Sequence, residues 1–366
     1  MKINVYNQFS LELKNSWIEL EKESDISIFQ TFEWNKSWFE TIGLKKGAQL
    51  YIVLVLHNDK PIIIFPFILK KSFGFKIISF IGDQQSDYLC PLINSSLDID
   101  FKNTWSLVTK SLPNHDLIYL EKYTLFGNHA NINFASVLNL KEVNISHSSS
   151  LPKTFEAFNL KLRPKLKSDI NRQKRRLSKL GKLEFQIITD SNEFKKLVPE
   201  MILQKRKRYK KTNVPDPFIN EDVHNFYINI VDIKSNNLIP HYSILKLGDK
   251  IIATHWGVIH KSRFYYLMPT YSADFMVYSP GKILLYFLIE ESISQKLKVF
   301  DFTIGGESYK NEWCNDSLQI FYYLKSMSFK GVLYKSFLLL INYARQNKFI
   351  WDNIRKAYRL INEFKC

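Results

Sequence analysis

A short sequence, Ser279 to Lys282, opens an apolar segment of helical character. The first backbone N–H groups of a helix have no partner within it, and with the positive end of the helix dipole they bind anions. Pro280 suits the first helical turn, since its missing N–H is not needed there. Gly281 permits a phosphate to approach the backbone closely, and Lys282 adds a positive charge. The four residues therefore predict either an ordinary helix start or a diphosphate site.

Two titratable side chains lie inside predicted strands. His255 is in the middle of the alternating segment 251–259 and has small neighbours on its face, so a ligand could approach it. Histidine titrates near neutral pH and is a natural proton acceptor for an amine, although a histidine satisfied within the core is the other interpretation. Asp301 lies in the apolar strand 298–304, where an unpaired carboxylate is costly. We expect Asp301 to pair with His255, with a substrate amine or, for a structural role, with a lysine.

Polar groups follow that strand after Gly305-Gly306, where the chain can turn sharply and leave a gap. Glu307 is a second candidate base, and Tyr309 is a candidate general acid. Further candidate substrate contacts are Tyr266, Tyr271 and Lys310. Packing in the core is the alternative for each of the tyrosines.

Composition limits the class of protein. The chain has 366 residues and 45% hydrophobic content, enough for two cores. No run of 18 apolar residues is present, and the N-terminus does not resemble a secretory leader. Three scattered cysteines predict neither a disulfide framework nor a metal site. These features predict a cytoplasmic protein without a transmembrane segment.

Positive charge is concentrated in one part of the chain. The net charge is +16, and residues 161–211 hold 18 Lys and Arg against 5 Asp and Glu, a net +13. A helix in this segment carries Arg172, Arg175 and Arg176, and a second cluster lies at 205–211. Such a patch indicates an anionic partner, namely a nucleotide, a phosphorylated lipid, a membrane surface or RNA. A solvated helix face is the alternative.

The predicted elements form two halves. Residues 1–150 read as α+β, with a helix beginning near Thr31 and a polar loop, 82–88, that offers Asp87 and Tyr88 to a ligand. The polar run Asn144–Ser150 reads as a linker. After the basic helix, the expected order from 183 to 325 is β-α-α-β-β-β-α-β-α-β. Residues 331–366 read as a basic amphipathic extension that packs on the domain or contacts a membrane peripherally.

This order, with the Ser-Pro-Gly-Lys loop before the helix that follows the fourth strand, resembles the GNAT acyltransferase fold. Tyr278–Leu285, Phe300–Gly306 and Tyr309-Lys310 resemble the FemAB-like branch. Phe29–Trp34 and Ser86–Tyr88 fit the cellulose-biosynthesis-associated acetyltransferase family within it. The resemblance covers roughly residues 25–325. The loop has fewer glycines and one basic residue fewer than is usual in the family, which leaves a carrier-protein or tRNA acyl donor open.

The resemblance implies an α/β (α+β) fold of two GNAT-like domains, each a mixed, mostly antiparallel sheet flanked by helices. The expected domains are 1–150, 151–330 with the acyl-CoA site, and an extension over 331–366. The implied reaction is N-acylation of an amino sugar, such as a dTDP- or UDP-linked one, by acetyl-CoA or another acyl-CoA in surface polysaccharide synthesis. Ser279, Pro280, Gly281 and Lys282 would bind the CoA diphosphate, and the arginines of the basic helix would bind the sugar nucleotide.

Two other functions are compatible with the sequence. A FemAB-type aminoacyl-tRNA-dependent peptidyltransferase would use the basic helix for RNA, but the long helical hairpin arm of its peptide-bridge enzymes is missing from the pattern. A non-enzymatic nucleic-acid-binding protein would use the same charges. Aromatic residues do not interleave with the basic helix, which disfavours base stacking. We therefore expect no specific nucleic-acid partner, and the sequence leaves the oligomeric state open.

Overall fold

The first half of the chain forms a six-stranded unit with helices on its faces. The structure, a computed structural model, describes residues 1–94, 99–125, 137–212, 216–233, 235 and 237–347. The strands are β1 (Lys2–Tyr6), β2 (Gln49–His57), β3 (Lys60–Ser72), β4 (Phe75–Phe80), β5 (Leu92–Ile93) and β6 (Leu117–Thr124). The helices are α1 (Leu11–Glu23), η1 (Ile28–Gln30), α2 (Phe32–Trp38), η2 (Phe39–Gly43), η3 (Asp83–Gln85) and α3 (Phe101–Ser111). As expected, Thr31 caps α2, because its side chain accepts from the Trp34 N–H.

The second half follows the expected order of elements. Its strands are β7 (Lys141–Ser150), β8 (Leu183–Ile188), β9 (Ile239–Leu247), β10 (Lys250–His260), β11 (Arg263–Tyr271), β12 (Val299–Ile304) and β13 (Asp316–Ser326). Its helices are α5 (Phe155–Lys161), α6 (Pro164–Ser178), α7 (Ser191–Thr212), η5 (Pro217–Ile219), α8 (Glu221–Val231), η6 (Ala273–Tyr278), α9 (Pro280–Ser294), η7 (Ser308–Glu312) and α10 (Phe329–Gln346).

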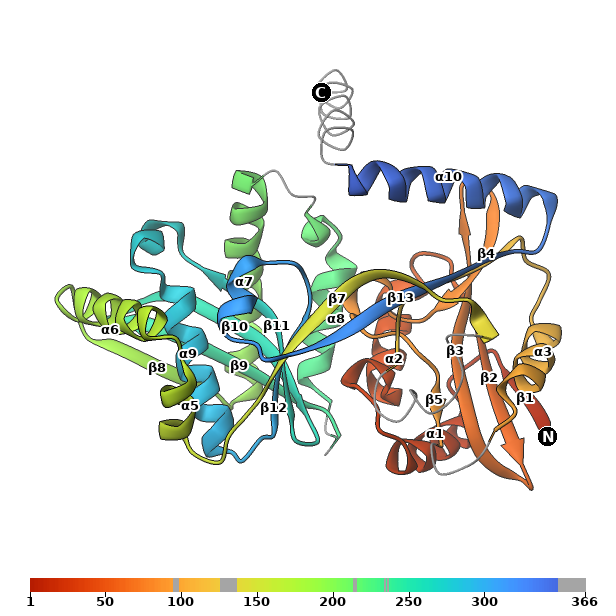
Figure 1. Cartoon of the computed structure of the whole chain (residues 1–366), viewed down its shortest axis with the longest axis horizontal. Coiled ribbons are helices and arrows are strands. Elements are labelled where there is room, and N and C mark those ends of the chain that lie inside the picture. The colour runs from red at the N-terminus through yellow and green to blue at the C-terminus, as the bar shows by residue number, and fades with distance from the viewer. Residues whose placement is uncertain (95–98, 126–136, 213–215, 234, 236, 348–366) are drawn as a thin grey trace, which may run out of the picture.

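One continuous sheet joins the halves. Its order is β1-β2-β3-β4-β6-β13-β7-β12-β11-β10-β9-β8, with β5 beside β3. The long strands β7 and β13 cross from one lobe to the other (Figure 1). β13 pairs with β6 of the first half and with β7, and β7 in turn pairs with β12. The link between the halves is therefore made of ladder hydrogen bonds as well as packed side chains.

The expected linker at Asn144–Ser150 is wrong, because these residues belong to β7. Serine and asparagine are uncommon in strands, so the composition indicated a loop. Here the strand is flanked on both sides, by β12 and β13, and its backbone groups are satisfied by them. The small side chains of Ser146 and Ser149 are buried between these neighbours.

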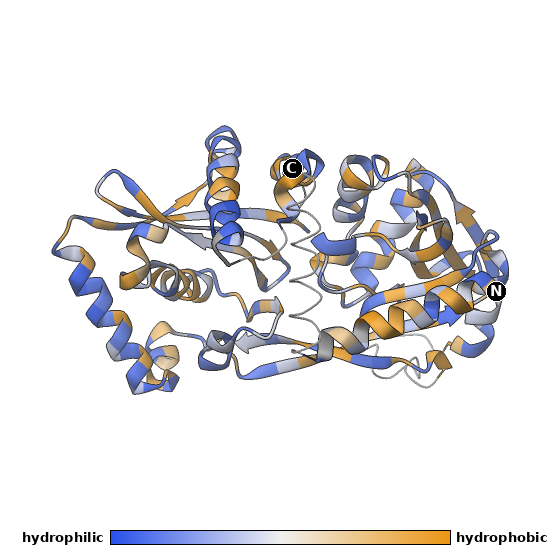
Figure 2. Ribbon diagram, turned by 90° about the horizontal axis from the view of Figure 1, so that it is seen from above, coloured by the Kyte–Doolittle hydropathy of each residue, from blue (hydrophilic) through white to orange (hydrophobic). Residues whose placement is uncertain are grey.

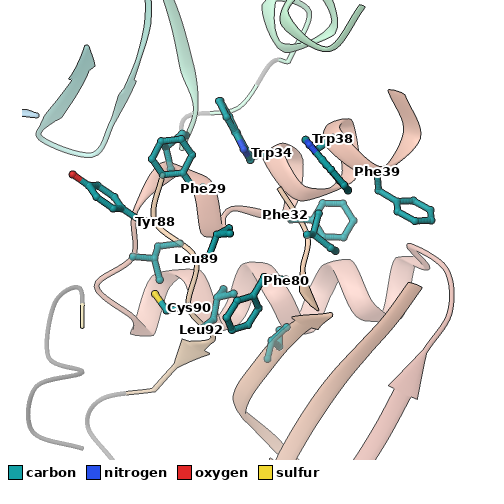
Figure 3. Close-up of a cluster of buried hydrophobic side chains, with 14 of the residues drawn as sticks. Phe29, Phe32, Trp34, Trp38, Phe39, Phe80, Tyr88, Leu89, Cys90 and Leu92 are labelled. Atoms are coloured by element: carbon teal, nitrogen blue, oxygen red, sulfur yellow. The ribbon is translucent and has the colours of Figure 1, made fainter. Parts of the chain in front are cut away.

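Aromatic side chains fill the space between the two halves. Phe29, Trp34, Trp38 and Tyr88 gather above the first-half core (Figure 3). The Trp34 ring meets Phe226 of α8 edge-on at 5.0 Å, and the ring of Phe29 lies 5.8 Å from that of Tyr265 on β11. The aromatic residues that follow Thr31 belong to the core, since Trp34 is fully buried and Trp38 nearly so.

The last described helix, α10, lies across the first half. It begins at the Ser328 cap, and Tyr334 stacks on Phe75 of β4 at 4.6 Å. A side chain at Gly331 would meet the Asp116 backbone oxygen at 1.9 Å, so only glycine permits this approach. Hydrophobic residues predominate along α10, whereas α6 is mostly hydrophilic (Figure 2). No described helix is both long and apolar enough to cross a bilayer.

Candidate active site

The centre of the second-half sheet is distorted by an extra residue in β11. Trp256 of β10 pairs with Met268, whereas Val258 pairs with Tyr265, so two steps along β10 match three along β11. The extra residue therefore falls at Tyr266 and Leu267. A bulge of this kind bends the strand and redirects its side chains, and bulges are frequent beside active sites.

Beyond the bulge, β11 and β12 separate. Their parallel pairing covers only Arg263–Tyr265 opposite Val299–Asp301, although β11 continues to Tyr271 and β12 to Ile304. In the described part of the chain, no ladder joins the two strands past that point. The gap continues into a cavity of about 780 Å³, a volume typical of small-molecule sites.

Five parts of the chain line this cavity. They are the loop after η3, the C-terminal part of α7, the bulged end of β11, the start of α9, and the end of β12 with the segment that follows it. The polar lining residues are Asp87, Lys205, Arg208, Tyr209, Tyr266, Tyr271, Ser279, Lys282, Thr303, Glu307, Tyr309 and Lys310. With Gly281, nine residues predicted from the sequence to bind or react meet here, although they come from segments more than 200 residues apart.

The start of α9 is built tightly against β11. Ser279 has left-handed backbone geometry, φ 50°, and its carbonyl accepts from the N–H groups of Lys282 and Ile283. A Cβ atom at Gly281 would lie 3.2 Å from Cδ1 of Tyr271, so any larger residue would press on the Tyr271 ring. Pro280 is buried at the first helical position. The helix N-terminus therefore opens beside the cavity, and Ser279, Gly281 and Lys282 are part of the lining.

Lys282 lies between this cavity and a second one. Its Nζ donates to Asp169 Oδ2 at 2.8 Å, and Arg172 donates to Asp169 Oδ1 at 2.6 Å. These two hydrogen bonds lower the pKa of Asp169 to about 2. The second cavity has about 580 Å³ and contains Arg163, Lys165, Ser168, Asp169, Arg172, Lys282 and Glu312. It is a cationic recess that shares Lys282 with the cavity between the strands.

A buried lysine holds the turn after β12. The Lys310 side chain is 3% exposed, and its Nζ donates to the Ile304 carbonyl at 3.0 Å and pairs with Glu307 at 3.0 Å. The Glu307 side chain is more than half exposed, in the cavity lining. Burial would raise the pKa of Glu307, but Lys310 outweighs this and keeps the pKa below its usual value. Glu307 is therefore an ionised carboxylate held towards the cavity.

Two further side chains of the cavity have shifted pKa values. Burial lowers the pKa of Lys205 to about 8, and the charge of Arg208 acts in the same direction. Burial and the charge of Glu307 raise the pKa of Tyr309 above its usual range. The sequence indicated the 205–211 cluster only as part of a basic patch for an anionic partner. That Lys205, Arg208 and Tyr209 line the cavity was missed, because only the fold brings α7 to β11.

His255 lies outside this cavity. It is fully buried, stacks on Tyr266 with ring centroids 4.5 Å apart, and has His241 and Phe264 as further ring neighbours. Neither ring nitrogen has a hydrogen-bond partner among the described residues. Burial, together with His241, lowers the pKa of His255 well below its usual value. Tyr266 does line the cavity, and its ring covers one face of the His255 ring.

Asp301 has structural partners. It accepts from Tyr88 Oη at 2.7 Å, Arg263 Nη1 at 2.9 Å and the Thr303 N–H at 2.8 Å. Burial raises its pKa, and the charge of Arg263 opposes that shift. The expected pairing of Asp301 with His255 or a lysine is thus replaced by an arginine and a tyrosine. The predicted substrate contact Tyr88 is used in this network and is 1% exposed.

The three arginines of α6 differ in position. Arg172 lines the second cavity. Arg176 stacks on the Tyr278 ring at 4.7 Å, and Arg175 donates to a carbonyl of its own helix. Within the described ranges, no group of three or more His, Cys, Asp or Glu side chains could hold a metal ion.

Residues 164–311, which contain the bulge, the separated strands and the α9 start, match the family described as an acetyltransferase (GNAT) domain. This chain therefore contains a GNAT-type domain and is an enzyme of the acyltransferase class. The expected fold class, a mixed and mostly antiparallel sheet flanked by helices, is confirmed. No curated protein sequence matches the chain.

Solved structures share the fold at low sequence identity. FemX is 10% identical, with a TM-score of 0.64, and the match covers 89% of this chain and 98% of FemX. A conserved protein of unknown function from Bacteroides thetaiotaomicron is 12% identical, with a TM-score of 0.54 and coverage of 89% and 100%. L-PGS from Bacillus licheniformis is 9% identical, with a TM-score of 0.51 and coverage of 90% and 95%.

Proposed function

We propose that this enzyme transfers an acyl group from acyl-CoA, acetyl-CoA in the first instance, to the amine of a nucleotide-linked amino sugar used in surface polysaccharide synthesis. The observation that carries the proposal is the separation of β11 and β12 directly beside the N-terminus of α9. An extended thioester arm can add to the free edge of a strand through backbone hydrogen bonds. Its diphosphate would then meet the helix N-terminus at Ser279 to Lys282.

The cavity supplies groups for the chemistry. Transfer to an amine requires that the amine lose a proton and that the thiolate leaving group gain one. Glu307 is ionised, faces the cavity and is held by Lys310, so it would bind the acceptor ammonium and take its proton, directly or through water. Tyr309 stays protonated because its pKa is raised, and it would donate to the leaving sulfur.

The second cavity supports a phosphorylated acceptor. Arg163, Lys165 and Arg172 line it, and Lys282 connects it to the reaction cavity. Cations of this kind form charge-assisted hydrogen bonds with phosphate oxygens. The nucleotide diphosphate would lie there and its sugar would reach Glu307. The polysaccharide context comes from the likeness to the cellulose-biosynthesis-associated acetyltransferases, and we place the reaction in the cytoplasm.

Calorimetry with CoA and acetyl-CoA, followed by thiol release with a panel of amino sugars free and nucleotide-linked, tests the proposal. We expect CoA binding and release of free thiol that depends on the amino sugar. Absence of CoA binding by the folded protein would refute the acyl-CoA donor.

One observation favours a second candidate, an aminoacyl-tRNA-dependent peptidyltransferase. FemX shares the fold over 89% of this chain, and α7 brings Lys205 and Arg208 to the cavity at the end of a cationic stretch. Transfer from aminoacyl-tRNA that is abolished by ribonuclease, without CoA binding, would establish this alternative.

A further inference from the structure

The outward side of α10 is an apolar face that no other described element of the chain covers. Tyr334 and Gly331 hold the helix on the first half, so its opposite side is presented to solvent. Seven apolar residues of the helix are exposed, with relative accessibilities between 41% and 79%. They are Phe329, Val332, Leu333, Phe337, Leu339, Leu340 and Tyr343. Figure 2 shows this helix from above as a mainly hydrophobic ribbon. Contiguous apolar patches of this kind mark interaction sites.

The tip of the β3–β4 hairpin extends the face. Phe73 is 85% exposed and has a positive φ of 50°, which an aromatic residue seldom adopts. It lies beside the helix, because Phe73, Phe75, Leu333, Tyr334 and Phe337 line one shallow recess of about 270 Å³. Two elements remote in sequence thus form a single apolar surface, defined here as the α10 face.

The two segments that form the α10 face carry charges of one sign. The hairpin from Lys70 to Lys76 and the helix from Phe329 to Asn347 contain no acidic residue. Lysines flank the apolar side chains, with Lys71 and Lys330 exposed and Lys76 and Lys335 partly so. Asp116, an acid at the start of the helix, accepts from the Ser328 hydroxyl and the Lys76 N–H and interacts with the charges of Lys76 and Lys330. The surface therefore combines exposed aromatic and aliphatic side chains with an excess of positive charge.

We propose that the α10 face binds the surface of an anionic phospholipid membrane. A helix with bulky apolar side chains and lysines lies in the interfacial plane, with its apolar side in the acyl boundary and its cations among acidic headgroups. A second copy of the chain is disfavoured as the occupant, because two such faces would bring like charges together. The inference is independent of the identity of the acyl acceptor.

Vesicle flotation with the full chain tests the proposal. The probes are vesicles of phosphatidylglycerol and phosphatidylethanolamine in equal parts, and vesicles of phosphatidylcholine alone. We expect binding to the acidic vesicles that weakens as NaCl rises from about 0.1 M to about 0.5 M, and weak binding to neutral ones. The variant Phe73→Ser/Phe337→Ser/Leu340→Ser should lose roughly tenfold or more of this affinity, since three inserted side chains are removed.

A matched control removes three exposed apolar side chains elsewhere. Leu160→Ser/Leu180→Ser/Ile219→Ser changes residues that are 84%, 57% and 74% exposed and lie outside the α10 face, so its vesicle binding should equal that of the wild type. Wild-type protein that does not float with acidic vesicles would overturn the proposal. So would equal binding by the two triple variants, or light scattering that shows a dimer dissociated only by the α10-face variant.

Discussion

Tyr88 donates a hydrogen bond of 2.7 Å to the Asp301 carboxylate, across 213 positions of the chain. Tyr88 belongs to the loop after β4 in the first half, and Asp301 lies in β12 at the last residue pair before β11 and β12 separate. The same carboxylate binds Arg263 and the Thr303 N–H. One buried acid therefore ties the first half to the point at which the candidate active site opens.

We expect Tyr88→Phe to lower the free energy of unfolding by about 1–3 kcal/mol, because Asp301 loses a buried partner. Urea unfolding followed by fluorescence measures this change. Tyr322→Phe is the control, because the Tyr322 hydroxyl forms no hydrogen bond with the described residues. We expect little change in the free energy of unfolding of this variant. If the two variants had equal free energies of unfolding, the Tyr88–Asp301 hydrogen bond would not contribute to stability.

Gly281→Val should weaken CoA binding with little change in melting temperature. The new side chain would lie against Tyr271 at the mouth of the cavity, where a Cβ atom already comes within 3.2 Å of that ring. Calorimetry with CoA and a thermal melt separate the two effects. Unchanged affinity in a folded variant would refute the assignment of the α9 start to the diphosphate.

Glu307→Gln keeps the size of the side chain but removes its charge and basicity. We expect kcat to fall by about 10²–10⁴-fold, the range for loss of a general base, while CoA affinity is retained. Steady-state kinetics over a range of pH measures this. Glu40→Gln, an exposed carboxylate of the first half that pairs with Lys36, is the control and should leave kcat unchanged. A Glu307 variant with wild-type kcat would exclude Glu307 as the base.

The arginines of α6 give a prediction about the acceptor. Arg172→Gln should raise the KM of a nucleotide-linked acceptor, since Arg172 lines the second cavity and Arg175 does not. Arg175→Gln is the matched control on the same helix and should change neither KM. The two KM values are measured by varying donor and acceptor separately. If only the donor KM rose in the Arg172 variant, the second cavity would belong to the CoA site.

Buried histidines should make stability depend on pH. Burial lowers the pKa of His241 to about 4 and that of His255 well below 6.5. As pH falls below 6.5, the unfolded chain binds protons that the folded chain excludes, so stability is complete above pH 6.5 and declines towards the folded pKa. Each such histidine should cost about 2 kcal/mol between pH 7 and pH 5.

His255→Gln tests this on one residue. The loss of unfolding free energy between pH 7 and pH 5 should be smaller in this variant by about 2 kcal/mol. His57→Gln, an exposed histidine, should leave the pH dependence unchanged. Because His255 does not line the cavity, we also expect near wild-type kcat in the folded variant. A large loss of kcat with unchanged pH dependence of stability would make His255 the base after all.

Local sequence was sufficient for most elements and for much of the candidate site. The Ser279–Lys282 loop and the polar residues after the Gly-Gly turn carry their own turn and helix-start chemistry. One cavity is lined by residues of both segments, namely Ser279, Gly281, Lys282, Glu307, Tyr309 and Lys310. Alternation placed His255 correctly on a strand, but it does not show that Tyr266 stacks on it. The polar β7 was missed because ladder pairing with two neighbours, rather than side-chain type, makes it a strand. Lys205 was missed as a site residue because long-range packing alone decides which turn of α7 meets β11.

The position of β13 in the sheet has a consequence for synthesis on the ribosome. β6 and β7 each pair with β13 along one edge, and β13 ends at Ser326. During synthesis these two edges therefore stay unpaired until nearly nine-tenths of the 366 residues have been made. Open edges template pairing with other chains. A nascent chain that stalls before Asp316 would therefore expose both edges to neighbours, and its protection would depend on chaperones rather than on its own fold.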